Sequence, residues 1–316
     1  MAAAAVAFAV GQMAATDHGR AADYGVTIRP GLVYAVRDGT RLSGDLYLPK
    51  GHPGAAVVVA MHGGAWRSGD RSFYKYWGRF LAGNGIALFT IDYRIGKPGA
   101  YPAPLHDVVA AIRFLRAKSA DLSIDPDRLG LMGDSAGAHL AAMIALASDR
   151  FDGGTTDAAG ASEPVKVRAV VGFYGIYDML AQWDHDSKAE RRREVLAQKN
   201  GDFLVRPPDS ITEQFLRASP AQNRRLYVQA SPITYATADH KDVRFLLFHG
   251  SRDDLVDPQT QSQAFVAALM KAGFSARLIV VPGAQHFWAS DAFEKDPRSY
   301  GAQAAPQLLK FLEDTL

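Results

Sequence analysis

Six short apolar runs constrain the fold of this chain more than any other feature. They occupy residues 55–61, 86–91, 129–132, 167–173, 243–248 and 276–281. Strands of this nearly continuous apolar type are buried on both faces, as parallel strands are. Helical spacing appears between them, for example where Val108, Ile112 and Leu115 fall on one face. The alternation predicts an α/β fold: a mostly parallel sheet flanked by helices with right-handed crossovers.

Two further regions complete the predicted architecture. Alternating residues 32–36 and 42–48 flank Asp38-Gly39 and indicate an antiparallel hairpin at a sheet edge, which gives a mostly parallel sheet of eight strands. Residues 177–234 contain a charged run at 184–193, a Pro-Pro pair and no clear strand periodicity. We interpret this segment either as a solvated, partly helical insertion or as a lid-like insertion over the site. No linker divides the chain, so residues 25–316 are expected to form a single domain.

Composition narrows the possible partners. The chain of 316 residues carries 35 basic and 33 acidic side chains, a balance that does not favour nucleic acid. Cysteine is absent, which excludes disulfides, a thiol nucleophile and cysteine-ligated metals. The sequence also lacks His-Glu-x-x-His and Gly-x-x-x-x-Gly-Lys. We therefore expect no metal and no cofactor, and a small molecule as the partner. Nothing in the sequence specifies an oligomeric state.

The N-terminal residues 1–24 are expected to be a flexible leader or a residual export signal. Residues 1–10 are apolar and small residues follow them, but no Lys or Arg precedes the run. The pattern leans towards an exported protein, periplasmic or secreted, with a cytoplasmic location as the alternative. No later apolar run approaches the roughly 20 residues that a membrane span needs.

The sequence Gly-Asp-Ser-Ala-Gly at residues 133–137 follows one apolar run directly and precedes a helix-prone stretch. In a nucleophile elbow the backbone at the serine is strained, and the flanking glycines avoid collisions with the adjoining strand and helix. This context predicts that Ser135 is a nucleophile exposed above the edge of the sheet.

The strand at 55–61 runs into His-Gly-Gly-Ala-Trp at residues 62–66. Consecutive glycines let a backbone approach a ligand and expose its N–H groups, which suits an oxyanion hole. We predict an oxyanion hole formed by Gly63, Gly64, Ala65 and Ala136, with the amides of the last three as donors. Such a donor lowers the barrier by about 3 to 4 kcal/mol.

A serine nucleophile needs a base and an acid that orients the base. The run at 243–248 leads into a loop with Asp253, Asp254 and Asp257, of which we choose Asp253 as the acid. Asp257 is expected instead to cap the helix that begins at Pro258. His286 follows the last apolar run and is predicted to be the base.

Other histidines and several aromatic residues receive supporting roles. We expect His62 to orient the oxyanion loop, His139 to pack one turn after the elbow, and His249 to support the acid loop. Core packing is the alternative to a substrate pocket for five aromatic residues: Trp66, Tyr93, Tyr174, Phe287 and Trp288.

With these residues in hand, the chain resembles the α/β-hydrolase superfamily, and within it carboxylesterases similar to the hormone-sensitive-lipase-like and bacterial or fungal feruloyl-esterase-like families. The resemblance covers roughly residue 34 to the C-terminus. It rests on residues 62–66 with Gly69-Asp70, on 92–94 (Asp-Tyr-Arg), on 125–128 (Asp-Pro-Asp-Arg), on 133–137 and on the Asp253 and His286 loops. Ala65 departs from the pattern, since many lipase-like relatives have a third glycine there.

The resemblance implies a serine carboxylesterase that hydrolyses short-chain or aryl esters through an acyl-enzyme intermediate, without a cofactor. Two alternatives remain open at this point. One is an amide hydrolase, such as an arylformamidase or a peptidase of the prolyl-oligopeptidase kind, because both reactions share the tetrahedral step. The other is a non-catalytic ligand-binding protein on the same fold.

Overall fold

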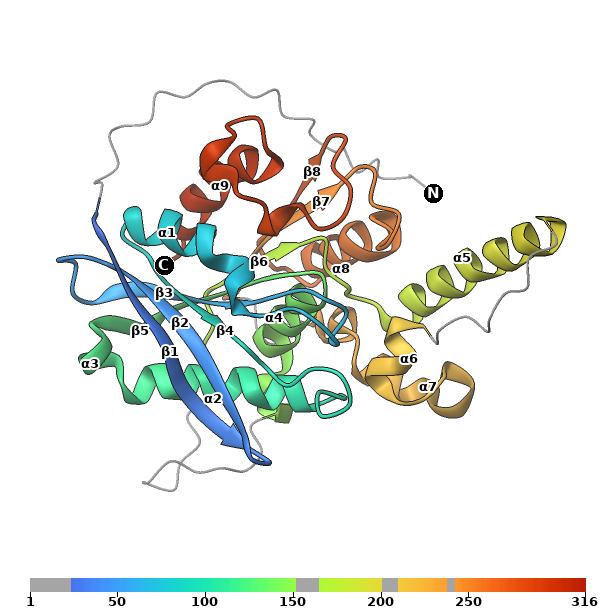
Figure 1. Ribbon diagram of the computed structural model, residues 1–316, viewed down its shortest axis with the longest axis horizontal. Helices are drawn as coiled ribbons and strands as arrows, with labels where there is room; N and C mark the ends of the chain where they lie inside the picture. The colour runs from blue at the N-terminus through green and yellow to red at the C-terminus, as the bar shows by residue number, and fades with distance from the viewer. Residues whose placement is uncertain (1–23, 152–164, 201–209, 238–241) are drawn as a thin grey trace.

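A computed structural model describes residues 24–151, 165–200, 210–237 and 242–316 (Figure 1). Its centre is an eight-stranded sheet with the order β1-β2-β4-β3-β5-β6-β7-β8. The strands are β1 (Val26–Arg37), β2 (Thr40–Pro49), β3 (Ala55–Met61), β4 (Ala87–Ile91), β5 (Ile124–Asp134), β6 (Ala169–Phe173), β7 (Arg244–Gly250) and β8 (Ala276–Val281). All six apolar runs form strands, as the sequence predicts.

The strand directions agree with the prediction of an antiparallel hairpin at one edge and parallel strands in the rest of the sheet. β1 pairs with β2 and β2 with β4 in antiparallel fashion, whereas every pairing from β4 through β8 is parallel. The mostly parallel sheet and the edge hairpin are thereby confirmed. One detail of the prediction is wrong: β8 is not buried on both faces, and Val280 is 42% exposed. β8 is the last strand of the sheet and has β7 as its one neighbour among the described strands, so fewer side chains cover it.

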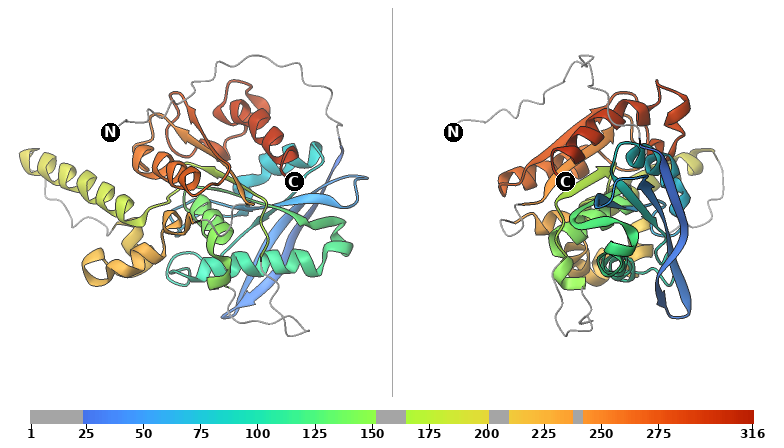
Figure 2. Two further views of the ribbon diagram at one scale, coloured as in Figure 1. Left: turned by 180° about the vertical axis from the view of Figure 1, so that it is seen from behind. Right: turned by 90° about the vertical axis from the view of Figure 1, so that its left-hand side faces the viewer.

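Helices cover both faces of the sheet (Figure 2). The helices are α1 (Lys75–Gly83), α2 (Ala103–Ala117), α3 (Ser119–Leu122), α4 (Ala136–Ala147), α5 (Met179–Asn200), α6 (Ile211–Leu216), α7 (Pro220–Gln229), α8 (Ala264–Lys271) and α9 (Tyr300–Glu313). Apolar side chains of α2, α4 and α8 pack in one core layer, and those of α1 and α9 pack in the other. The two layers bury the sheet between them, which is the α/β-hydrolase architecture.

The described part of the 177–234 segment contains α5, α6, α7 and a short 3₁₀ turn at Pro232–Tyr235. α5 extends outward from the rest of the fold, while α6 and α7 lie closer to the sheet (Figure 1). The segment is therefore helical over most of its described length. The predicted leader, residues 1–24, lies outside the described residues except for its last position.

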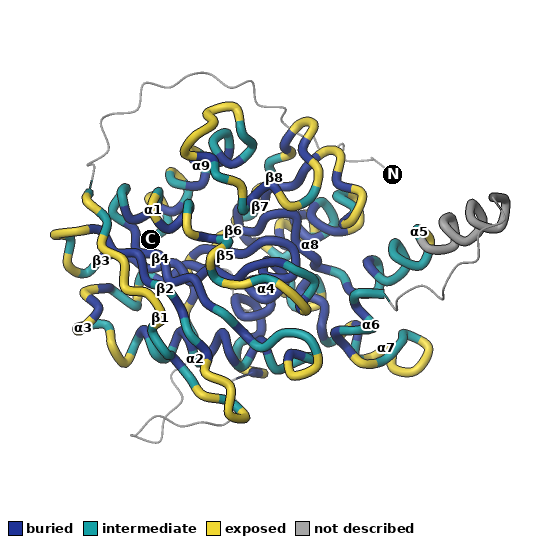
Figure 3. The backbone as a smooth tube through the Cα atoms, viewed as in Figure 1, coloured by how far each residue is buried: buried dark blue, intermediate teal, exposed yellow. Residues whose placement is uncertain are grey.

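The centre of the sheet is buried along its whole length, and exposure is concentrated on loops and on the outer strand β1 (Figure 3). Every residue of β3, β4 and β6 is buried. The carboxyl ends of the parallel strands meet at one edge, where ligands bind in open α/β sheets. Among the described helices, none has the length and apolar character that crossing a bilayer requires.

Candidate active site

The turn between β5 and α4 has the strained geometry of a nucleophile elbow. Ser135 adopts φ +51° and ψ −117°, a conformation that costs a non-glycine residue on the order of 1–3 kcal/mol. A Cβ at Gly133 would lie 2.3 Å from the carbonyl carbon of Gly137. A Cβ at Gly137 would lie 2.0 Å from the carbonyl oxygen of Met61. Both glycines are therefore required by close backbone approach, as expected from the sequence.

The structure brings together the three side chains predicted from distant parts of the sequence. His286 Nε2 lies 3.0 Å from Ser135 Oγ, and His286 Nδ1 lies 2.6 Å from Asp253 Oδ2. Because Asp253 is a carboxylate, Nδ1 is assigned as the donor, which leaves Nε2 to accept the serine proton. The arrangement is that of a nucleophile, a base and an orienting acid.

The acid loop holds Asp253 in its charged form. Burial alone would raise the pKa of Asp253, but hydrogen bonds from His249 and His286 outweigh burial and keep this pKa well below its usual value. The amides of Leu255 and Val256 also donate to Asp253 Oδ1, each at 3.0 Å. A buried carboxylate with this many donors stays ionised and can stabilise an imidazolium.

His249 takes the supporting role expected of it. Its Nδ1 lies 2.6 Å from Ser262 Oγ, and its Nε2 lies 3.0 Å from the carbonyl oxygen of Val256 and 3.3 Å from Asp253 Oδ2. The network assigns the proton to Nε2. His249 thus supports the acid loop through these contacts, and its ring nitrogens bond to residues other than Ser135.

The two competing aspartates of this loop take other positions. Asp257 accepts hydrogen bonds from the amides of Gln259 and Thr260, at 3.4 and 3.1 Å, and so caps the helix that leads into α8, as expected. Asp254 is exposed. Of the three, Asp253 alone contacts His286.

The loop between β3 and α1 lies against the elbow. Among the described residues, the amides of Gly64, Ala65 and Ala136 have no hydrogen-bond acceptor. The carbonyl of Gly64 instead accepts from the amides of Arg67 and Ser68, which turns the loop back on itself. Ala136 opens α4, and the first amides of a helix have no intrahelical partner. These three amides remain the candidate oxyanion donors.

The amide of Gly63 is not among the predicted donors, and it is engaged elsewhere. It donates to Asp134 Oδ1 at 2.8 Å, and Tyr74 Oη donates to the same oxygen at 3.0 Å. A Cβ at Gly63 would lie 2.3 Å from Asp134 Oδ2. Gly63 therefore anchors the loop to the elbow, since its N–H is already engaged. Burial, partly offset by these two hydrogen bonds, raises the pKa of Asp134 to about 6.

Two histidines behave as expected outside the catalytic group. His62 Nδ1 lies 2.7 Å from the carbonyl oxygen of Gly63, and its ring stacks on Tyr93 at 4.3 Å. His139 is buried one turn after the elbow, where its Nε2 lies 2.9 Å from the carbonyl oxygen of Ala230. Burial lowers the pKa of His139 to about 4.

Most of the five candidate pocket aromatics are core residues instead. Trp66 is 1% exposed and Tyr93 Oη donates to the carbonyl oxygen of His62 at 2.6 Å. Tyr174 is fully buried, with its ring 4.4 Å from that of His286 and its hydroxyl accepting from the Ala289 amide. For Trp66, Tyr93 and Tyr174 the core alternative thus holds, because each side chain is at most 4% exposed.

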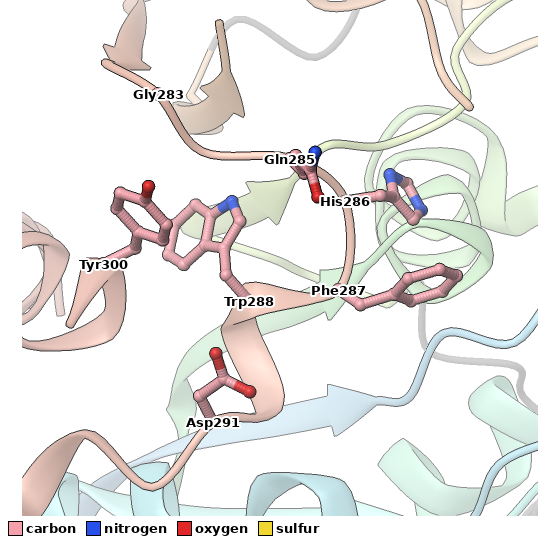
Figure 4. Close-up of a pocket in the computed structure, with 7 residues that line it drawn as sticks. All are labelled: Gly283, Gln285, His286, Phe287, Trp288, Asp291 and Tyr300. Atoms are coloured by element: carbon pink, nitrogen blue, oxygen red, sulfur yellow. The ribbon is translucent and has the colours of Figure 1, made fainter. Parts of the chain in front are cut away.

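Phe287 and Trp288 line a pocket beside the base (Figure 4). The pocket has a volume of about 340 Å³ and is lined by Gly283, Gln285, His286, Phe287, Trp288, Asp291 and Tyr300. Phe287 is 56% exposed and meets the imidazole edge-on at 4.5 Å, whereas Trp288 is buried and forms one wall. Phe287 is the exposed apolar side chain next to the base.

Two residues of this region escaped the sequence analysis. Asp134 carried a usable signal, since a carboxylate at the end of an apolar strand requires partners when it is buried. Phe215 carried none. It lies in α6, and its ring stacks on Trp66 at 4.3 Å with an interplanar angle of 8°. The two residues are 149 positions apart in the sequence, so no local pattern relates them.

A family model named BD-FAE matches residues 44–269. The chain belongs to the BD-FAE family. The match includes the elbow, the oxyanion loop and the acid loop, and it stops before His286. The resemblance to α/β-hydrolase esterases that the motifs suggested is confirmed.

Named relatives of this BD-FAE chain carry esterase names. It is 33% identical over 276 residues to a probable isoprenylcysteine alpha-carbonyl methylesterase of Arabidopsis thaliana, covering 87% of this chain and 53% of the relative. It is 31% identical over 235 residues to the esterase LipQ of Mycobacterium tuberculosis, covering 73% and 50%. The chain thus spans about half the length of the curated relatives it matches.

Solved structures share the fold. Esterase 2 of Thermogutta terrifontis phosphonylated by sarin superposes with a TM-score of 0.69, at 21% identity, over 94% of this BD-FAE chain and 96% of that chain. A bifunctional GH43-CE protein of Bacteroides eggerthii matches with a TM-score of 0.68 at 26% identity, over 91% of this chain and 38% of that chain. The α/β-hydrolase fold is confirmed by these neighbours.

Proposed function

We propose that this chain is a serine carboxylesterase that hydrolyses short-chain or aryl carboxylic esters. One observation carries the proposal: the hydrogen-bonded series Ser135, His286 and Asp253, with distances of 3.0 and 2.6 Å. The esterase names of the relatives support the same reaction class. The three unpartnered amides near the elbow supply the electrostatic part of the catalyst.

In this mechanism His286 Nε2 takes the proton of Ser135 as Oγ attacks the ester carbonyl carbon. The carbonyl oxygen becomes an oxyanion, which the amides of Gly64, Ala65 and Ala136 stabilise. Asp253 stabilises the imidazolium without taking its proton. The imidazolium then protonates the alcohol oxygen as the C–O bond breaks. Water, deprotonated by the same imidazole, attacks the acyl carbon. The imidazolium then returns this proton to Ser135 Oγ as the bond between the acyl carbon and Oγ breaks, which releases the carboxylic acid and restores the serine.

The decisive experiment compares the protein with its Ser135→Ala variant on p-nitrophenyl butyrate. We expect turnover in the parent and a loss of about 10⁶-fold in kcat for the variant, because the nucleophile is absent. Labelling by a fluorophosphonate probe should disappear in parallel. Unchanged circular dichroism would show that the variant is folded. Equal turnover by both proteins would contradict the assignment.

A matched pair of substrates separates esterase from amidase. p-Nitrophenyl butyrate and p-nitrobutyranilide differ in the leaving atom, and both reactions pass through the tetrahedral step. We expect the ester to be preferred in kcat/KM. A preference for the anilide would replace the carboxylesterase with an amide hydrolase, while an absence of labelling and turnover would point to a ligand-binding protein.

A further inference from the structure

The oxyanion loop contains two consecutive residues in a conformation that L-amino acids disfavour. Ala65 has φ +53° and Trp66 has φ +56°. A left-handed conformation costs a non-glycine residue on the order of 1–2 kcal/mol, and a bulky side chain rarely adopts it. Such a loop keeps its shape only when neighbouring groups hold it. The amides of Gly64 and Ala65, two of the candidate oxyanion donors, lie immediately before Trp66.

Contacts from outside the loop hold Trp66. Its ring stacks on the Phe215 ring at 4.3 Å and 8°, and it meets the His139 ring edge-on at 5.2 Å and 88°. Its carbonyl accepts a hydrogen bond from the Gly96 amide at 2.8 Å. Trp66 is 1% exposed, so the stack is shielded from water. Offset-stacked aromatic pairs of this kind are favourable beyond the area they bury.

Phe215 comes from the 177–234 segment and is itself firmly placed. It is 3% exposed in α6, and its carbonyl accepts from the Tyr101 amide at 3.0 Å. α6 is tied to α5 because Trp183 Nε1 donates to Glu213 Oε1 at 2.7 Å. A second link to the loop runs on the surface, where Arg67 Nη1 donates to Gln214 Oε1 at 3.2 Å.

We propose that Phe215 is a positioning residue that, through Trp66, holds the amides of Gly64 and Ala65 in the oxyanion-binding orientation. The proposal rests on the proposed esterase function. It assigns the inserted helices a role in the chemical step besides any role in covering the site.

The physical reason is the narrow tolerance of oxyanion stabilisation. A donor acts fully when it lies about 2.7–3.1 Å from the developing oxyanion. Without the Phe215 ring, Trp66 can relax towards an ordinary φ, and the peptide planes before it rotate. The amides then point away from the oxyanion, while the pocket that binds the ground-state ester is unchanged. The loss should therefore appear in kcat, since it concerns the transition state.

The test uses Phe215→Met, which keeps the apolar volume but removes the flat ring. We expect kcat for p-nitrophenyl butyrate, normalised by active-site titration, to fall on the order of 10- to 100-fold, below the 10²–10³-fold of a deleted donor. KM should stay within about twofold. Phe215→Tyr keeps the ring and should recover most of the lost kcat.

Tyr227→Met is the matched control. Tyr227 is a fully buried aromatic residue of the same segment, on α7, and its hydroxyl donates to the carbonyl of Ala218 rather than to the loop. Its replacement should lower stability to a similar degree and leave the normalised kcat within about twofold.

A double-mutant cycle tests whether the effect passes through Trp66. If one stack is responsible, Trp66→Leu combined with Phe215→Met should lose no more activity than Trp66→Leu alone. Additive losses would overturn the proposal, as would a kcat for Phe215→Met equal to that of Tyr227→Met, or a loss confined to KM. A parent protein without esterase activity would instead refute the proposed function, so the two failures are distinguishable.

Discussion

The two sides of the candidate site are built in different ways. On one side, Ser135, Asp253 and His286 follow the carboxyl ends of β5, β7 and β8, strands that are aligned by continuous parallel ladders. On the other side, the inserted helix α6 reaches the oxyanion loop through a ring stack and a surface hydrogen bond. Backbone ladders place the strand-built side, whereas individual side chains place the inserted side.

This difference predicts graded consequences of substitution. On the strand-built side a single atom change interrupts a series of hydrogen bonds that acts as a unit. On the inserted side a single change loosens one contact among several. The strongest effects on activity should thus come from residues at the strand ends, and the weakest from residues that tie the inserted helices together.

After removal of the nucleophile itself, the largest expected effect is that of Asp253→Asn. An amide at this position favours the wrong imidazole tautomer, because its NH₂ group can donate to Nδ1, and kcat should fall about 10⁴-fold. Asp254→Asn, an exposed neighbour in the same loop, should retain full activity on p-nitrophenyl butyrate. If the two variants lost activity equally, Asp253 would not be the orienting acid.

Gly64→Ala should come next. A Cβ there would lie 2.1 Å from the carbonyl oxygen of Ser68, and the residue has φ +110°. The loop must shift, which should cost about 10²–10³-fold in kcat. Gly51→Ala is a suitable control, since Gly51 also has positive φ (+77°) but no atom lies within 4 Å of its Cβ position. Comparable kcat values for both variants would show that a Cβ at Gly64 does not displace the oxyanion donors.

Asp134→Asn should change the pH dependence of stability. The folded pKa of about 6 lies above the usual 3.8, so between these pH values the unfolded chain loses its proton first and unfolding becomes easier as pH rises. The parent should lose on the order of 3 kcal/mol of unfolding free energy across this window relative to the Asn variant. Urea unfolding at pH 4 and pH 7 measures the difference. If the stability of the parent relative to the Asn variant were the same at pH 4 and pH 7, Asp134 would already be ionised below pH 4 in the folded protein.

The smallest expected effect is that of Trp183→Phe, which removes the hydrogen bond to Glu213 between α5 and α6. We expect a loss of about 1 kcal/mol in stability and less than a twofold change in kcat, since Phe215 keeps its other contacts. Thermal unfolding and p-nitrophenyl butyrate kinetics check this. A large loss of kcat would remove the distinction between the two sides of the site.

The strand-built side could be predicted from the order of residues along the chain. The apolar runs located the strands, and the glycines at 133 and 137 located the elbow. Residues that directly follow a parallel strand lie at one edge of the sheet, so the positions of Ser135, Asp253 and His286 followed from the order of the chain. These inferences work because strands, turns and helix starts depend on neighbours within a few residues.

Four other features could not be predicted and arise only in the folded chain. The Gly63 amide donates to Asp134, Trp66 lies in the core instead of a substrate pocket, β8 is partly exposed, and Phe215 stacks on Trp66 of the oxyanion loop. Each of these features depends on contacts between residues far apart in the chain. The hydrophobic pattern of a sequence does not identify such contacts, because it shows that a ring is buried but not which distant side chain packs against it.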